Sequence, residues 1–300
     1  MTTNLSPSLE RYLTSLNAIG DRMQNAQREI TSGKRVNTVS DSPDQVSTLL
    51  QTRASLATAA QIQSNLGRFK LETDAGEQAL QAATQLMDRV QTLGTQAATS
   101  TQTPDGFAAI GQELGSILEQ MGGLAATSVG GRYIFSGDRD GTKPYSIDLT
   151  QANPVSLYFG SAATRVAQHP NGNTFSVSQT AQQIFDGGGT ANVFQSIVAL
   201  RDAALANDST AAATAVGNLT FAASHLNDSL AYYGSVQNQI AAATDFGSNL
   251  QVQLKTQISG LEDADLTSAI LELNQGQVQQ QAALEAYGRI PRTTLFDFLK

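Results

Sequence analysis

The sequence predicts a mainly α-helical protein: an elongated antiparallel helical bundle or coiled coil built from both chain ends, with a small β-rich domain inserted in the middle. Three observations lead to this fold class. Apolar residues recur every three or four positions over long stretches of both halves, as in helices that pack along one stripe. Short β-branched and aromatic runs are concentrated in residues 132–190, and glycine runs bracket that segment.

The first helix is expected over residues 1–31. Its apolar residues alternate spacings of three and four, which places them on one stripe and predicts a partner helix on that side. Gly33 ends the pattern, and a loop follows as far as Asp41. The stripe residues are Leu9, Tyr12, Leu16, Ile19, Met23, Ala26 and Ile30.

Two further helices are predicted before the β-rich segment. Residues 42–45 form a helix start, because serine can cap the free amides and proline suits the first helical position. The helix that they open extends to about Ala98, which is roughly 80 Å at 1.5 Å per residue. A polar break with Pro104 separates it from a third helix around residues 110–124.

Residues 132–190 are expected to form the β-rich insertion. Its strand candidates are the runs at 133–135, 155–159 and 174–177, and turn residues separate them. A run of three glycines at 187–189 closes the segment. The insertion is therefore predicted to be a separable unit between two helical halves.

Helical periodicity returns after the insertion. A short helix is predicted from Phe194, a long one over residues 210–261, and a last one from Leu266. Short connections make consecutive long helices antiparallel, so the two terminal helices should lie side by side. Residues 1–40 carry a net charge of +2 and residues 261–300 one of −3, which favours this pairing weakly.

Composition excludes several classes of function. The formal net charge is −8, whereas nucleic-acid binders carry basic patches that neutralise phosphates. No segment reaches the roughly 18 uninterrupted apolar residues of a membrane span, and residues 1–10 lack the features of a cleaved signal peptide. The chain has no cysteine, which excludes disulfides and thiolate metal sites. We therefore expect no nucleic-acid partner and no membrane association.

No constellation of residues indicates catalysis, a cofactor or a metal. His169 and His225 lie in different regions, and both are expected to be surface or packing residues. Residues 136–141 resemble the start of a calcium loop, but Ile147 takes the position that requires an acidic ligand. The glycines at 187–189 lack the lysine and hydroxyl residue of a phosphate loop. The chain is therefore not expected to be an enzyme.

Low charge and apolar chain ends predict a protein that packs against other subunits. Charged residues make up 15% of the chain, against about 25% in an average soluble protein, so copies can pack together with little repulsion. A helix at a chain end has little of its own protein to contact, so packing between subunits competes with packing inside the monomer as the role of its apolar residues. The assembly interface predicted on this basis comprises Leu9, Leu16, Met23, Ile30, Leu266, Ile270, Leu273, Leu284, Leu295, Phe296 and Phe298.

Motifs near both chain ends and one in the middle carry a resemblance to a known family. The segment at residues 30–37, followed by the acidic helix start at 40–44, resembles the N-terminal signature of bacterial flagellins. Residues 262–281 resemble the helix that opens the C-terminal region of that family. Residues 131–137 and the ending at 294–299 resemble the branch of the family whose members join hook and filament.

The resemblance implies a structural subunit of the bacterial flagellum that self-assembles through paired terminal helices at the junction of hook and filament. It implies a ring of identical subunits, contact with an adjacent hook-associated protein and with filament flagellin, and a flagellar export chaperone at the C-terminal region. It also implies export through the flagellar type III apparatus without a cleaved signal, and an extracellular location. Filament flagellin itself is the alternative within the family, and a helical signalling hairpin is the less favoured alternative outside it.

Periodicity and resemblance together predict five segments. Residues 1–40 form an N-terminal inner-tube helix and loop, and residues 41–131 form the first half of a helical rod domain. Residues 132–190 form the β-rich outer domain that is inserted into the rod. Residues 191–260 form the second half of the rod, and residues 261–300 form the C-terminal inner-tube helix.

Overall fold

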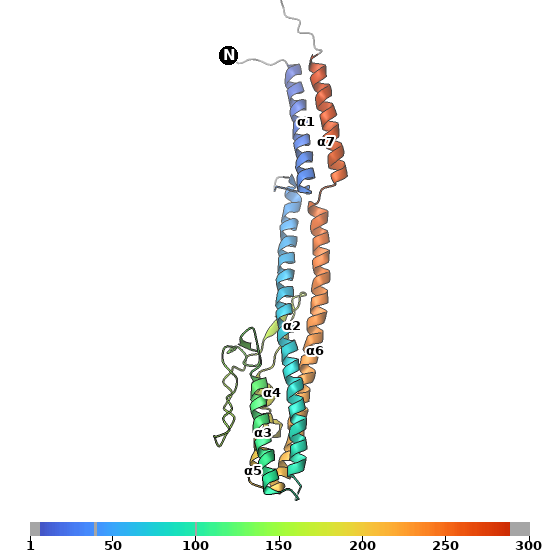
Figure 1. Ribbon diagram of the computed structural model, residues 1–300. Coiled ribbons are helices and arrows are strands. Elements are labelled where there is room, and N and C mark those ends of the chain that lie inside the picture. Colours follow the sequence, from blue (N-terminus) through green and yellow to red (C-terminus); the bar gives the residue numbers. More distant parts are fainter. Residues whose placement is uncertain (1–6, 39–40, 100, 289–300) are drawn as a thin grey trace, which may run out of the picture. The chain divides into compact units, whose positions relative to one another are not determined.

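The computed structural model describes residues 7–38, 41–99 and 101–288 (Figure 1). The chain divides into two compact units. The first comprises Met1–Thr58 and Gln251–Lys300, and the second comprises Ala59–Leu250. The predicted mainly helical fold with small sheets is confirmed. The division into five segments stays a prediction.

Seven α-helices and four short strands form within the described residues. The helices are α1 (Pro7–Ser32), α2 (Pro43–Ala97), α3 (Pro104–Ala125), α4 (Ala181–Phe185), α5 (Val193–Leu205), α6 (Ser209–Glu262) and α7 (Leu266–Gly288). The strands are β1 (Ser128–Val129), β2 (Arg132–Tyr133), β3 (Val166–Gln168) and β4 (Thr174–Ser176). Parts of α2 and α6 belong to each unit.

In the first unit, α1 and α7 lie antiparallel and side by side (Figure 1). The Tyr12 hydroxyl donates a hydrogen bond to the Ala283 carbonyl oxygen (3.2 Å), and the Tyr12 ring stacks on Tyr287 with centroids 4.8 Å apart. Ile19 and Ala26, on the predicted apolar stripe of the first helix, are buried. The two ends of the chain therefore pair through that stripe, as the heptad spacing requires.

In the second unit, one large hydrophobic core joins α2, α3, α5 and α6. The α2 and α6 helices run antiparallel there, since Gln237 donates a hydrogen bond to Asp74 (3.1 Å), while Gln63, earlier on α2, donates to Ser248, later on α6 (3.4 Å). The pairing of α3 with α5 closes the core on another side (Figure 1). The largest aromatic side chains in this core are fully buried: Phe135, Tyr145, Phe185, Phe194 and Tyr233.

Two glycines on α2 offer a matched test of this packing. A Cβ atom on Gly76 would lie 2.7 Å from the Tyr233 ring, which is buried and cannot yield, whereas one on Gly67 would meet nothing within 4 Å. Gly76→Ala should lower the free energy of unfolding by about 1–3 kcal/mol through overpacking. Gly67→Ala should raise it by up to about 1 kcal/mol, because alanine favours helix. Urea denaturation measures the change in the free energy of unfolding for each variant. An increase for Gly76→Ala would contradict this packing.

The segment between α3 and α5 holds two separate antiparallel sheets, β1–β2 and β3–β4. Gly130 and Gly131 connect β1 to β2 with φ angles of +59° and +78°, which only glycine adopts easily in a two-residue hairpin turn. β4 confirms the strand predicted at 174–177, and β2 covers the start of the run predicted at 133–135. β1 and β3 lie outside the runs that were predicted as strands.

The strand predicted at 155–159 is wrong. Val155 forms a single bridge to Ile147, and the Phe159 amide donates to the Pro144 carbonyl oxygen (2.9 Å). Proline has no amide to return a bond, so a regular ladder cannot continue there. The Tyr158 hydroxyl donates to the Phe135 carbonyl oxygen (3.0 Å), so this side chain anchors the segment to the core and does not extend a sheet.

An ion-pair network joins the β-rich segment to α2. The Arg165 guanidinium, whose side chain is 17% exposed, pairs with Glu72 of α2 and lies 3.1 Å from Asp140. Asp140 also accepts a bond from the Arg132 Nε (2.9 Å). Two arginines and two carboxylates thus satisfy one another, which holds the irregular loops against the helical core.

Candidate assembly surface

Both histidines make contacts within the fold. Among the described residues, no group of three His, Cys, Asp or Glu side chains could hold a metal. The His225 Nε2 lies 2.7 Å from the Gln183 carbonyl oxygen, and the His169 ring packs against Phe246 with centroids 5.1 Å apart. None of the helices in the described ranges combines the length and apolar character of a membrane span. The features that remain unexplained lie in the first unit.

The α7 helix contacts α1 mainly through small side chains. Only Ala269 and Gly276 are buried on α7, although the helix has 23 residues. A methyl group added to Gly276 would overlap the Met23 side chain, so glycine permits the close approach of the two helices there. The Arg22 guanidinium donates to the Gln279 Oε1 (3.1 Å) beside this contact. The pairing of α1 with α7 therefore uses few of the large apolar residues of α7.

Five of the large aliphatic side chains of α7 are exposed to an unusual degree. At 100° per residue, two of them fall on the side opposite Gly276, and three fall beside the contact with α1. They are between 46% and 66% exposed, and exposed large apolar side chains gathered on one helix normally mark an interaction site. We call this set the α7 apolar face: Leu266, Ile270, Leu271, Val278 and Leu284.

The connections α1–α2 and α6–α7 are hydrogen-bonded to each other, and we call this region the joint. The Arg35 amide donates to the Glu262 carbonyl oxygen (2.7 Å), and the Ala264 amide donates to the Gly33 carbonyl oxygen (3.0 Å). Gly33 follows the end of α1 with a φ of +71°, a conformation that glycine adopts easily. Lys34 forms a β-bridge with Asp263. These backbone hydrogen bonds thus hold the α1–α2 and α6–α7 connections next to each other.

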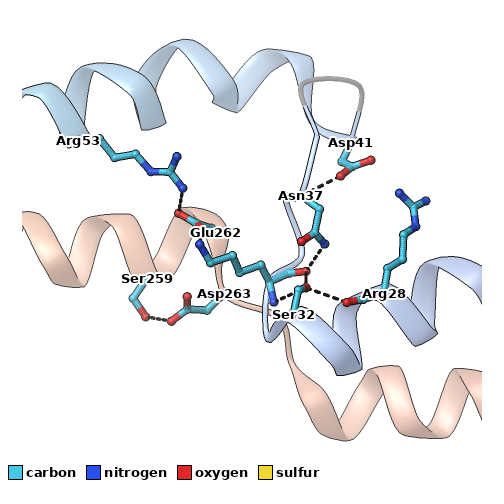
Figure 2. A network of polar contacts seen from close by, with 9 residues as sticks. Arg28, Ser32, Asn37, Asp41, Arg53, Ser259, Glu262 and Asp263 are labelled. Carbon is cyan, nitrogen blue, oxygen red and sulfur yellow. Dashed lines mark hydrogen bonds and ion pairs between the residues drawn. The ribbon is translucent and has the colours of Figure 1, made fainter.

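A buried carboxylate completes the joint (Figure 2). The Glu262 side chain is only 3% exposed, and it forms ion pairs with the Lys34 ammonium and the Arg53 guanidinium. Burial alone raises the pKa of Glu262, but the hydrogen bonds and charges of Lys34 and Arg53 outweigh it and hold the pKa below the usual 4.5. The carboxylate is therefore ionised at neutral pH and links the loop, α2 and α6.

Two exposed aspartates cap the ends of the joint. Asp41 accepts bonds from the amides of Asn37 (2.9 Å) and Thr38 (2.7 Å). Asp265 accepts bonds from the Thr267 amide (3.0 Å) and the amide and hydroxyl of Ser268, so it caps the start of α7. These bonds lower the pKa of both aspartates. Helix α7 therefore has a defined first turn beside the joint.

Comparison with protein families identifies the family of this chain. Residues 4–140 match the model of the bacterial flagellin N-terminal helical region, and residues 216–299 match that of the flagellin C-terminal helical region. The chain belongs to the flagellin family. It is a structural component of the flagellum, and both members of the α1–α7 pair lie within the matched regions. None of the curated proteins matches the chain.

Solved structures with the same fold are flagellar as well. A protein described as a flagellar hook-associated protein from Vibrio parahaemolyticus has 19% identity and a TM-score of 0.65, over 74% of this flagellin-family chain and 100% of its own. FlgL from Xanthomonas campestris has 19% identity and a TM-score of 0.62, over 69% and 99%. The flagellar junction protein FlgL from Legionella pneumophila has 13% identity and a TM-score of 0.54, over 72% and 98%. These likenesses show a shared fold.

The predicted interface residues of this flagellin-family chain fall into three groups. The first group is partly buried along the stripe and α7, and the second is exposed on the α7 apolar face. The third lies outside the described residues. The first, partly buried group is Leu9, Leu16, Met23, Ile30 and Leu273. The second, exposed group is Leu266, Ile270 and Leu284, and the third group is Leu295, Phe296 and Phe298.

Sequence reasoning missed Leu271 and Val278, which are 58% and 66% exposed. Both lie off the heptad stripe, so a search for a seam passes over them. Their spacing of seven residues places them on one side of α7, and that is the signal that could have identified them.

Gly276 allows the pairing of α1 and α7 to be tested directly. Gly276→Val should weaken the pairing by about 1–3 kcal/mol, because the added side chain overlaps Met23. Hydrogen exchange at the Ile19 and Ala26 amides of α1 should then become faster. The matched control is Gly260→Val on α6, where a Cβ atom would meet nothing within 4 Å. Equal exchange in the two variants would show that close approach at Gly276 is unimportant.

Proposed function

We propose that this flagellin-family protein is the subunit that joins hook and filament, and that it self-assembles through the α1–α7 pair. The observation that carries the proposal is the α7 apolar face, which α1 leaves uncovered. Burying each such side chain against another subunit contributes about 1.5–3 kcal/mol. Five of them on one helix supply a strong driving force for assembly, without a cofactor or a reaction.

The fold supports the junction over other flagellar positions. Structures whose names refer to hook-associated or junction proteins match this chain over nearly their whole length. By that likeness, the partners are further copies in a ring, an adjacent hook-associated protein and filament flagellin. The chain would reach them by flagellar type III export, and an export chaperone would hold its C-terminal region beforehand.

The test is localisation together with deletion. A strain that lacks this chain should retain hooks and lose filaments, while its cells release filament subunits into the medium. An antibody against the chain should label a short zone at the base of each filament in electron micrographs of the parent strain. Labelling along the whole filament would instead assign the chain to filament flagellin.

Filament flagellin is the second candidate, since the matching family models are those of flagellin itself. The two roles differ in copy number, because a filament repeats its subunit far more extensively than a single ring does. Quantitative mass spectrometry of purified flagella separates them. A chain that dominates the preparation is the filament protein, and a chain that is a trace component is the junction protein.

A further inference from the structure

We propose that a cleft beside the joint receives the C-terminal segment of a second copy of this chain. The cleft has a volume of about 340 Å³. The inference rests on the proposed function, because it requires subunits to assemble. It goes beyond that function by naming the surface to which the apolar C-terminal segment of the chain binds. The residues that carry the argument are Lys34, Val36, Leu49, Leu50, Arg53 and Glu262, all of which line the cleft.

The cleft combines an apolar floor with a positive rim. Val36 and Leu49 are buried beneath it, and Leu50 is exposed at its edge. The Lys34 and Arg53 side chains are about half exposed, and Glu262 neutralises only one of their two charges. Arginine carries five N–H donors, so Arg53 can bind a further carboxylate while it keeps its pair with Glu262.

The last residues of the sequence have the complementary chemistry. Leu295, Phe296, Phe298 and Leu299 are large and apolar, and Asp297 places one negative charge among them. Phenylalanine side chains fit an apolar floor, and a carboxylate fits an arginine at its rim. A segment with only apolar residues would not use the two cations. A segment with only charges would not use the floor.

Chain length favours a neighbouring copy as the donor of this segment. The cleft lies at the joint, where α7 begins, whereas the chain leaves α7 at Gly288. From Leu266 to that residue, α7 spans about 33 Å at 1.5 Å per residue. The eight residues from 289 to Phe296 reach at most about 29 Å when fully extended. Phe296 therefore does not reach the start of α7 in its own copy, and we take a neighbouring copy as the donor of the segment.

Engineered cysteines provide a direct test, because the chain has none of its own. Cells would express one chain with Leu50→Cys and a second with Phe298→Cys, and their isolated flagella would be oxidised. We expect a disulfide-linked dimer of the two chains. The control replaces the first chain by Leu71→Cys, an equally exposed leucine further along α2 that does not line the cleft, and should give at least tenfold less dimer.

Other outcomes overturn the inference in distinguishable ways. If both variants enter flagella and give no dimer, or as much dimer with Leu71→Cys, the segment does not bind the cleft and the proposed function stands. A disulfide within a chain that carries both Leu50→Cys and Phe298→Cys would assign the cleft to the same copy. If even the unaltered chain is absent from flagella, the proposed function fails, and this inference fails with it.

A charge at the rim gives a second measurement. Leu50→Glu should reduce incorporation into flagella at least tenfold, while Leu71→Glu should change it less than twofold. Leucine is 58% exposed at position 50 and 62% at position 71, so both monomers should keep the melting temperature of the parent chain. Equal incorporation of the two variants would show that the cleft is unoccupied in the assembly.

Discussion

A chain with glutamates in place of Leu271 and Val278 is expected to fold normally and to be almost absent from isolated flagella. Both side chains are exposed on α7, so the monomer keeps its packing when they change. Each large apolar side chain removed from a subunit interface costs about 1.5–3 kcal/mol, and a buried unpaired carboxylate costs more. Incorporation is expected to fall more than a hundredfold. Quantitative immunoblotting of flagella and of the culture medium measures it.

The control for that experiment carries the same charges on the second unit. Leu205→Glu combined with Phe221→Glu changes two residues that are 48% and 58% exposed there. This variant should enter flagella at no less than half the parental amount. If its incorporation falls as far as that of the α7 variant, added charge alone prevents assembly and the α7 apolar face has no special role.

The second large effect is expected at the joint. Glu262→Gln removes the charge that Lys34 and Arg53 share, and a buried hydrogen bond to a charged group contributes about 1.5–3 kcal/mol. The Arg35 and Ala264 amides, whose bonds connect the two turns of the joint, should exchange about tenfold to a hundredfold faster. Glu285→Gln, an exposed position on α7, should leave both rates unchanged.

The pH dependence of this effect has a definite sign. The pKa of Glu262 is lower in the folded chain than the ordinary 4.5, so its ionisation stabilises the joint above that value. The contribution disappears as the pH falls through the lowered folded pKa, because the carboxyl is then protonated. The parent chain and Glu262→Gln should therefore differ at neutral pH and converge in acid. A difference that persists well below pH 4 would assign it to the shape of the side chain.

The helices follow from the sequence because their signals are local and repeated. The heptad stripe of the first helix and the helix start predicted at Pro43 agree with the structure, whereas α3 begins at Pro104, which the sequence had placed in the break before it. The strand predicted at 155–159 failed because its partner segment contains Pro144, which lies eleven or more residues away in sequence. A β-branched run shows that a residue suits a sheet, but not whether a partner can bond to it.

The candidate site was less accessible to prediction for a related reason. The heptad pattern predicts the contact face of both terminal helices, and this holds for α1. On α7, Gly276 and Ala269 make the close contacts, while larger residues such as Ile270 stay outside. The joint was also not foreseen, because Lys34, Arg53 and Glu262 belong to three distant parts of the sequence. Nothing local marks any of them as partners.

In the proposed assembly, the pairing of α1 with α7 makes incorporation depend on a chain having been synthesised through α7. Tyr12 and Ala283 are separated by 271 positions, so α1 is synthesised long before its partner exists. Any chain that stops early would display the apolar stripe of α1 with nothing to cover it. Such a fragment would lack the joint, the α7 apolar face and the C-terminal segment at once. Under the proposed function, premature termination therefore yields a product that is excluded from the assembly and does not enter it as a faulty subunit.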